Sequence, residues 1–275
     1  MRRIGSAVAA VALTGLLAAP AHAVVGGDPA DTADHPWMVA LGSGELHPDR
    51  PSGQFCGATL VAPTKVVTAA HCVDDKRPDQ ITAIGGRPDI RTQDGTERRV
   101  TRIWNAPSEP PPPPPPGELP TLRGGDIAVL TLDAPMPYPT LPIATEADAD
   151  VYRPGTPGRI LGWGIYQEEG LLGPSPVLQQ AQIPMLEFRA CDEASRNHPA
   201  LPTKLDPRHY VCGGYEQGGV AACGGDSGGP LVIDGRLAGV FGPILSRGGT
   251  VCEDAYSGYN RVATYAGEIL AEVNT

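Results

Sequence analysis

The chain has 275 residues and a formal net charge of −10 at pH 7. Its length is sufficient for one large or two small hydrophobic cores. An acidic chain without runs of basic residues argues against a phosphate-backbone ligand, so we expect no nucleic-acid partner.

The first 23 residues predict a secretory signal peptide. Arg2 and Arg3 precede an apolar run from Ile4 to Ala19, and Ala21-His22-Ala23 forms a small-x-small cleavage site. The run is too short for a transmembrane anchor. We therefore expect a secreted protein without a membrane anchor, whose mature domain spans residues 24–275; a cut after Ala21 also fits the small-x-small rule and would leave His22-Ala23 attached.

Short runs of apolar, β-branched and aromatic residues predict an all-β protein. Turns rich in the 35 glycines and 31 prolines separate these runs, a pattern typical of antiparallel barrels or a sandwich. The predicted strands are Trp37–Leu41, Ala58–Val61, Val100–Trp104, Ile127–Leu132, Arg159–Trp163, Val177–Met185, Pro230–Ile233 and Leu237–Phe241.

One helical pattern lies at the end of the chain. Val262, Tyr265, Ile269, Leu270 and Val273 recur at spacings of three and four residues. This spacing places them on one apolar face, which predicts a C-terminal helix packed on the body of the protein.

Pro110 to Pro116 is an unbroken run of seven prolines. As a polyproline II helix it would span about 22 Å. The sequence leaves three interpretations open: a stiff surface loop, a wall beside a substrate site, or a docking site for a proline-binding partner.

Six cysteines, all after the predicted signal peptide, indicate disulfides. They are Cys56, Cys72, Cys191, Cys212, Cys223 and Cys252. An even number in an exported chain favours three bridges, although six cysteines allow 15 pairings. No C-x-x-C pair is present to suggest zinc, and we expect no metal and no cofactor.

Three separated polar residues are candidates for nucleophilic catalysis. Ser227 lies among glycines, where a tight turn would expose its hydroxyl, although such a run could also be a plain glycine-rich hairpin. His71 follows an apolar pair, and Asp126 precedes an apolar strand. A hydroxyl needs a neutral imidazole to take its proton, and the imidazole needs a carboxylate to fix its tautomer.

An α/β-hydrolase is a second interpretation of the serine motif, because residues 225–229 also fit its G-x-S-x-G turn. That fold requires a histidine after the serine. No histidine follows Ser227, so the order of residues excludes this interpretation.

Six stretches, in the same order along the chain, resemble the trypsin/chymotrypsin family of serine endopeptidases. They are Val24-Val25-Gly26-Gly27, Thr68–Cys72, Asp126–Leu130, Gly162-Trp163-Gly164, Tyr210–Gly214 and Cys223–Pro230. The resemblance implies two antiparallel six-stranded β-barrels with a C-terminal helix. It also implies an active site in the cleft between the barrels and a barrel boundary at roughly 135–150.

The resemblance also implies roles for individual residues. Ser227 would attack the scissile carbonyl, His71 would transfer the proton and Asp126 would orient His71. The N–H groups of Gly225 and Ser227 would bind the oxyanion.

The same resemblance implies how the enzyme is activated and how its cysteines pair. A freed amine at Val24 would form an activating ion pair with Asp226, the residue before the nucleophile. The implied disulfides are Cys56–Cys72, Cys191–Cys212 and Cys223–Cys252. The expected partners are peptide or protein substrates and a protein inhibitor, and we expect a monomer.

Several positions depart from the family pattern. Ala221 stands six residues before Ser227, where members that cut after Lys or Arg carry an aspartate, so a substrate cation would be unpaired. With Ile244 and Ser257 at wall positions, the pocket predicts cleavage after small or medium apolar residues; the alternative is that Ile244 faces away from the pocket. Gly242 lacks the hydroxyl that helps to hold the catalytic aspartate in the family.

A catalytically weak or inactive homologue that acts as a binding protein is the remaining alternative, although all three triad residues are present. Gly86 stands where the family's calcium loop has its first carboxylate, and we interpret Asp94 and Glu97 as a solvated turn. His35, His198 and His209 have no partner pattern, and we expect them at the surface.

Overall fold

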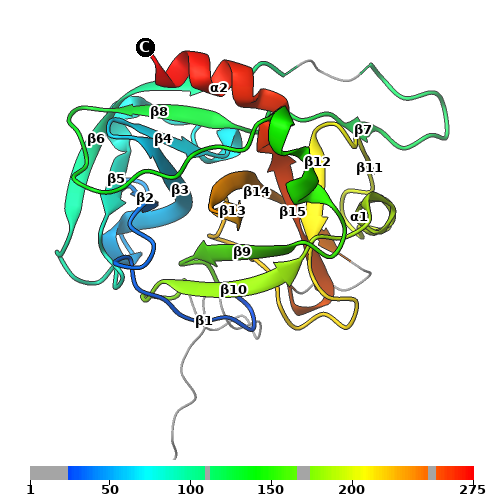
Figure 1. Cartoon of the computed structure of the whole chain (residues 1–275), viewed down its shortest axis with the longest axis horizontal. Helices are drawn as coiled ribbons and strands as arrows, with labels where there is room; N and C mark the ends of the chain where they lie inside the picture. The colour runs from blue at the N-terminus through cyan, green and yellow to red at the C-terminus, as the bar shows by residue number, and fades with distance from the viewer. Residues whose placement is uncertain (1–23, 109–111, 166–173, 247–251) are drawn as a thin grey trace, which may run out of the picture.

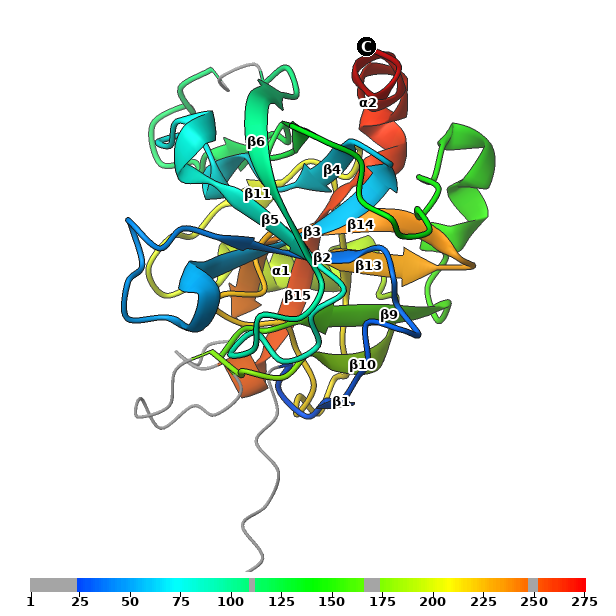
Figure 2. The same cartoon turned by 90° about the vertical axis from the view of Figure 1, so that its left-hand side faces the viewer.

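The structure of the chain is a computed structural model that describes residues 24–108, 112–165, 174–246 and 252–275. The predicted signal peptide and its cleavage site lie outside the described residues. Two β-barrels make up most of the fold, and Figures 1 and 2 show them from two sides.

Six antiparallel strands close the first barrel in the order β2-β3-β4-β8-β6-β5. They are β2 (Met38–Gly42), β3 (Gln54–Ala62), β4 (Lys65–Thr68), β5 (Thr82–Gly85), β6 (Thr96–Asn105) and β8 (Ala128–Leu132). Leu41, Leu60, Val66 and Leu130 are fully buried in its core. The β-branched residues Val67 and Val129 are also fully buried there, and such side chains pack well on a pleated surface, which favours the strand.

The second barrel is built from strands in the order β10-β9-β13-β14-β15-β12. They are β9 (Pro157–Gly162), β10 (Gln179–Pro184), β12 (Tyr210–Gly213), β13 (Pro230–Ile233), β14 (Arg236–Ser246) and β15 (Ala255–Arg261). The ring closes where the Leu186 N–H donates to Cys212 O at 3.0 Å and the Gly214 N–H donates to Pro184 O at 3.1 Å. The predicted fold of two barrels is thus confirmed.

The helices differ in part from the prediction. The C-terminal helix α2 (Ala266–Val273) is present and buries Ile269, but Leu270 is 42% exposed, so its predicted place on the buried face was wrong. A second helix, α1 (Phe188–Arg196), was not predicted. Its buried residues Cys191, Ala194 and Ser195 follow the helical spacing of three and four, but they are small and were not recognised as a helical pattern.

Each end of the described chain packs on the barrel made by the other half. Near the N-terminus, β1 (Asp28–Pro29) pairs with β10, and Val25 and Ala221 exchange two backbone hydrogen bonds. At the C-terminus, α2 lies over the first barrel (Figure 1). There the buried carboxylate of Glu272 pairs with Lys65 Nζ at 3.3 Å and accepts from Arg102 Nη2 at 2.9 Å.

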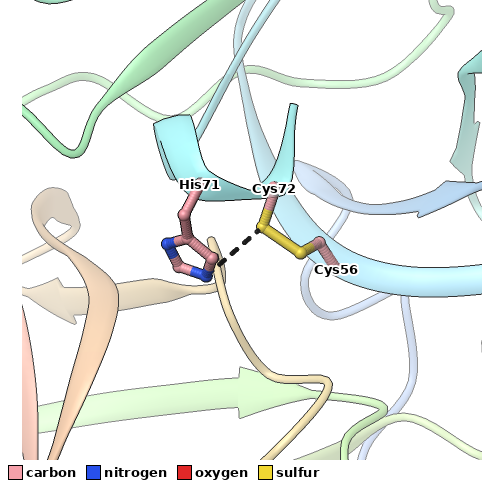
Figure 3. A group of neighbouring side chains, drawn as sticks. All are labelled: Cys56, His71 and Cys72. Atoms are coloured by element: carbon pink, nitrogen blue, oxygen red, sulfur yellow. Dashed lines mark hydrogen bonds between the residues drawn. A yellow bond between two sulfur atoms is a disulfide. The ribbon is translucent and has the colours of Figure 1, made fainter. Parts of the chain in front are cut away.

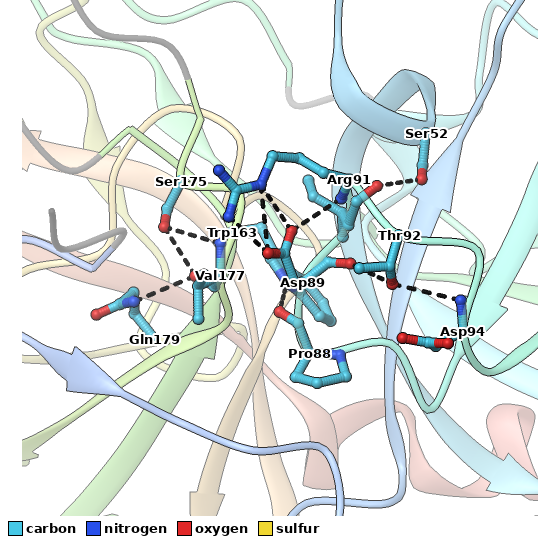
Figure 4. A network of polar contacts seen from close by, with 11 residues as sticks. Ser52, Pro88, Asp89, Arg91, Thr92, Asp94, Trp163, Ser175, Val177 and Gln179 are labelled. Carbon is cyan, nitrogen blue, oxygen red and sulfur yellow. Dashed lines mark hydrogen bonds and ion pairs between the residues drawn. The ribbon is translucent and has the colours of Figure 1, made fainter.

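A loop after β5 joins the two barrels on another side, and Figure 4 shows its contacts. The Pro88 carbonyl accepts from Trp163 Nε1 at 3.1 Å and from the Leu178 N–H at 2.7 Å. The Ile90 N–H donates to Pro176 O at 2.8 Å. Trp163, almost fully buried, thus holds the first barrel to the second.

His35 also lies near this junction, and its predicted surface position was wrong. The side chain is 6% exposed, and its Nε2 lies 3.0 Å from Gln180 Oε1 on β10. Burial lowers the pKa of His35 below its ordinary value of 6.5, so the ring stays neutral at physiological pH.

Three disulfides join the pairs implied by the resemblance: Cys56–Cys72, Cys191–Cys212 and Cys223–Cys252. Residues 110 and 111 of the proline run lie outside the described residues, whereas residues 112–116 are exposed. The loop returns to the body through a Glu118–Lys204 ion pair of 2.7 Å and two short parallel strands, β7 (Thr121–Leu122) and β11 (Lys204–Leu205). Within the described ranges, no helix has the length and apolar character needed to cross a membrane.

Candidate active site

His71 and Asp126 come together because their strands are neighbours. His71 lies in the 3-10 turn η2 (Ala70–Cys72) just after β4, and Asp126 lies just before β8. The register of these strands places Thr68 opposite Ala128, so the residues beyond their ends meet. His71 Nδ1 is 2.9 Å from Asp126 Oδ2, and the backbone N–H of His71 donates to Oδ1 at 2.8 Å.

The Cys56–Cys72 disulfide lies beside the imidazole, as Figure 3 shows. His71 Nε2 is 3.9 Å from Cys72 Sγ. Because a disulfide sulfur carries no proton, this contact leaves the lone pair of a neutral Nε2 available to accept a proton. The bridge also limits the movement of the residue next to His71.

The carboxylate tunes the basicity of the ring. The hydrogen bond with Asp126 holds the pKa of His71 above its ordinary value of 6.5, against an opposing effect of burial. An imidazole can act as a general base, and it does so most effectively when its pKa is near the working pH.

The turn that carries Ser227 comes from the second barrel but is fastened to the first. The Gly57 N–H, on β3, donates to Ser227 O at 2.7 Å. An ideal Cβ on Gly228 would lie 3.1 Å from the Ala69 nitrogen and still closer to Thr68 Oγ1, so only glycine permits this approach. These contacts bring the serine turn against the segment that leads into His71.

The peptide groups around Ser227 have defined directions. The Gly224 carbonyl accepts from the Ile165 N–H at 2.7 Å, and the Gly225 carbonyl accepts from Gln54 Nε2 at 3.0 Å. In a trans peptide the N–H points opposite to the carbonyl, so the Gly225 N–H points away from Ile165. Among the described residues, no backbone carbonyl accepts from the N–H of Gly225 or of Ser227.

Asp226 is buried beside Ser227. Its Oδ1 accepts from the Gly164 N–H at 2.8 Å and its Oδ2 accepts from the Cys223 N–H at 2.9 Å. Burial raises the pKa of Asp226 to about 7, and these two hydrogen bonds oppose the effect only in part. No cationic side chain in the described part of the chain pairs with it.

Val24 lies inside the second barrel. Its side chain is fully buried among apolar residues that include Ala222. The next residue, Val25, is fixed by its backbone bonds to Ala221. The chain therefore enters the protein next to the segment that leads to Asp226.

The three residues predicted to shape a substrate pocket are neighbours. Ser257 lies opposite Ile244 in the register of β14 and β15, and its Oγ accepts from the Ala222 N–H at 2.9 Å. Ala221 and Ser257 are fully buried, whereas Ile244 is partly buried and packs near the Cys223–Cys252 disulfide. None of these three side chains carries a charge.

Sequence reasoning missed two buried amides at this site. Gln54 donates to the Gly225 carbonyl, and Asn260 on β15 donates to Asp126 Oδ2 at 3.4 Å. Neither amide lies in a sequence pattern that marks it as functional, because each is defined by a partner far away in the chain.

Two other features of the described residues are not part of the site. A cavity of about 380 Å³, lined among others by Trp37 and Arg159, includes none of the three predicted catalytic residues. Cys56, Cys72 and His71 form a group with the spacing of metal ligands. Because both sulfurs are in a disulfide, this group offers no thiolate to a metal.

Comparisons with known proteins agree with this geometry. A family model described as Trypsin matches residues 24–269. The chain is 36% identical over 253 residues to "Trypsin" of Saccharopolyspora erythraea, which covers 91% of this chain and 98% of that protein. It is 32% identical over 249 residues to "Trypsin-like protease" of Streptomyces glaucescens, which covers 90% and 81% of the two chains. It is 31% identical over 260 residues to "Trypsin eta" of Drosophila erecta, which covers 93% and 92%.

Two barrels that meet at a histidine–aspartate pair and a serine-bearing turn are the arrangement of a serine endopeptidase. Within this class of enzymes, the chain belongs to the trypsin family.

Proposed function

We propose that this enzyme hydrolyses peptide bonds through Ser227, His71 and Asp126. The two-point contact between Asp126 and His71 is the observation that carries the proposal. The fastening of the serine turn to β3 supports it, because this turn then lies beside the base.

In this mechanism, His71 Nε2 takes the proton of the Ser227 hydroxyl as its oxygen attacks the scissile carbonyl. Asp126 stabilises the imidazolium that forms. The N–H groups of Gly225 and Ser227 stabilise the oxyanion of the tetrahedral intermediate. The imidazolium then protonates the leaving amine, and water hydrolyses the acyl-enzyme by the same steps in reverse order.

Removal of the nucleophile tests the mechanism. We expect Ser227→Ala to lower kcat for a peptide substrate by several powers of ten while the fold survives. A sulfonyl fluoride should label the wild-type chain at Ser227, located by mass spectrometry, and should not label the variant. A wild-type protein that binds peptides but is neither labelled nor active would favour the alternative of an inactive homologue.

We further propose a preference for small or medium apolar residues before the scissile bond. The absence of charge on Ala221, Ile244 and Ser257 supports this, since a Lys or Arg side chain would be buried without a partner. One methylene changes discrimination by about 1–3 kcal/mol, so the apolar preference should be broad.

Cleavage of a peptide library, read by mass spectrometry, measures this preference. We expect few cuts after Lys or Arg in the wild type. Ala221→Asp should increase cleavage after these two residues relative to apolar ones. A wild type that cuts mainly after Arg or Lys would overturn the pocket assignment.

We also propose that residues 1–23 direct export and are then removed, and that residues 24–275 form the protease domain. The three disulfides support an oxidising destination outside the cell. The monomeric state and control by a protein inhibitor stay predictions from the resemblance.

A further inference from the structure

Asn260 places a buried amide against Asp126. It lies on β15 with no exposed surface, and its Nδ2 is 3.4 Å from Asp126 Oδ2 and 3.5 Å from the Val240 carbonyl oxygen. Among the described residues its Oδ1 has no hydrogen-bond partner. A buried amide with an unpaired oxygen is costly, so another interaction must offset this cost.

The neighbouring groups fix the orientation of the amide. Both atoms near Nδ2, a carboxylate oxygen and a carbonyl oxygen, are acceptors. Rotation of the amide by half a turn would place Oδ1 against both of them. The N–H groups therefore face Asp126.

Gly242 provides the space for this amide. The pairing of β14 with β15 shifts register between Phe241 and Ile244, and Gly242 lies in that irregular segment. An ideal Cβ on Gly242 would lie 2.9 Å from Asn260 Nδ2 and 3.1 Å from Asp126 Oδ2. A side chain at 242 and the amide of Asn260 would thus compete for one place beside the carboxylate.

We propose that Asn260 is a positioning residue for catalysis, whose amide performs the task that a hydroxyl at position 242 would otherwise perform. This inference rests on the proposed role of Asp126 in orienting His71. With the backbone N–H of His71 on Oδ1, and the imidazole and Asn260 on Oδ2, the carboxylate cannot rotate freely.

The Asn260 amide also influences the pKa of His71, because it interacts with the negative charge of Asp126. The positive end of the N–H dipole offsets part of the negative charge of Asp126. Loss of the amide should therefore raise the pKa of His71. Asp74 and Lys76 also influence the pKa of His71 through their charges, and Tyr210 and Tyr265 lie near enough to Asp126 to interact with its charge. The variants described below change none of these four residues.

The first test is Asn260→Ala. We expect kcat per labelled active site to fall about tenfold with little change in KM, because a hydrogen bond to a charged group is lost and substrate does not reach position 260. The acid limb of kcat/KM should move to higher pH. Gln179→Ala is the matched control, since Gln179 is another buried amide with an unpaired oxygen, and its amide nitrogen donates to the Val177 carbonyl instead. It should leave the acid limb unchanged.

The second test restores a hydrogen-bond donor to Asp126 from position 242 in place of Asn260. In the Asn260→Ala background, Gly242→Ser should recover most of the lost kcat and return the acid limb towards its wild-type position. Gly242→Ala in the same background adds the same Cβ without the hydroxyl and should recover nothing. Gly242→Ser alone should lower kcat, because its Cβ displaces the Asn260 amide.

The inference is overturned if Asn260→Ala keeps the wild-type kcat and acid limb, or if serine and alanine at 242 behave alike in the Asn260→Ala background. If Asn260→Ala folds poorly, Gly242→Ser and Gly242→Ala in the wild-type background decide the matter: both displace the Asn260 amide, only serine brings a hydroxyl, and equal kcat values would overturn the inference. A wild type that sulfonyl fluoride does not label would instead overturn the proposed function. The two failures are therefore distinguishable.

Discussion

Two charged residues beside His71 act on its pKa in opposite directions. Asp74 raises the pKa of the imidazole and Lys76 lowers it, both less strongly than Asp126. Asp74 is exposed, so its effect passes partly through solvent. Neither residue forms a hydrogen bond with the imidazole ring. Substitutions at these two positions can therefore change the pKa of His71 while its contact with Asp126 is kept.

We predict that Asp74→Asn moves the acid limb of kcat/KM to lower pH and that Lys76→Gln moves it to higher pH. The signs follow because removal of a negative charge destabilises the imidazolium and removal of a positive charge stabilises it. Measurement at low and high salt provides the check, since both shifts should shrink as salt screens the charges. Shifts of the same sign would contradict the assignment of the limb to His71.

Which single residues can be predicted from sequence depends on how local their signals are. Ser227, His71 and Asp126 were singled out because each lies in a short recognisable stretch beside an apolar run. Asn260 has no such signal. Its contact with Asp126 depends on a register shift in β14, which no local pattern reveals.

At the level of the elements, the loop that links β5 to β6 is built around the buried side chain of Arg87. The guanidinium of Arg87 is 2% exposed; its Nε donates to Asp94 O at 2.6 Å and its Nη1 to Ser52 Oγ at 3.1 Å. Its Nη2 pairs with Glu97 at 2.9 Å. Asp94 and Glu97, interpreted from the sequence as a solvated turn, are both exposed, whereas Arg87 is buried and supplies a fixed positive charge to the loop.

We predict that Arg87→Met lowers the free energy of unfolding by about 2 kcal/mol, because buried acceptors lose a charged donor. Thermal unfolding followed by circular dichroism would show a fall in Tm of roughly 5 °C for a domain of this size. Arg91→Met in the same loop is the control, because its ion pair with Asp89 involves an exposed arginine and should contribute little.

The same loop should not depend on added metal. We expect EDTA to leave the Tm of the wild type unchanged, since Arg87 already neutralises Glu97. A large fall in Tm with EDTA, reversed by calcium, would contradict this account of the loop.

Strands were predictable where apolar residues are dense and not where small residues form the core. Pro230–Ile233 was predicted with its observed bounds. Of the barrel strands, β4, β5, β12 and β15 went unpredicted: β4 and β5 have only four residues each, and β12 and β15 contain glycine and tyrosine and are defined by their partners across the sheet. The same holds for α1, whose buried face is made of small side chains.

At the level of the whole molecule, we propose that the state of the N-terminus sets the charge balance around the buried Asp226. When residues precede Val24, Asp226 is a buried carboxyl with its pKa raised to about 7. A cut before Val24 would create an amine at a buried position next to the segment that leads to Asp226. We propose that this amine pairs with Asp226 and that the cut activates the enzyme.

We predict that protein starting at Val24 is active and that protein with one extra residue before Val24 is nearly inactive. Because the folded pKa of Asp226 in the extended form is above its unfolded value, the extended form loses stability as pH rises through about 7. The amine offsets this loss in the processed form. The difference in Tm between the two forms should therefore be larger at about pH 8 than at about pH 5.

Activity measurements and Tm at both pH values check this prediction, with the extra residue verified by mass spectrometry. Equal activity of the two forms would end the proposal. A Tm difference that does not vary with pH would show that Asp226 does not provide it.

The crossed packing of the two chain ends gives the molecule a mechanical property. The strand β1 precedes the first barrel in the sequence but pairs with β10 of the second barrel. The helix α2 follows the second barrel in the sequence but packs on the first, where Glu272 pairs with Lys65. Separating the barrels would therefore strip a strand from one and a helix from the other at the same time. We therefore expect the two barrels to melt as one cooperative body. We expect these two contacts to keep His71, carried by the first barrel, at a constant spacing from Ser227, carried by the second.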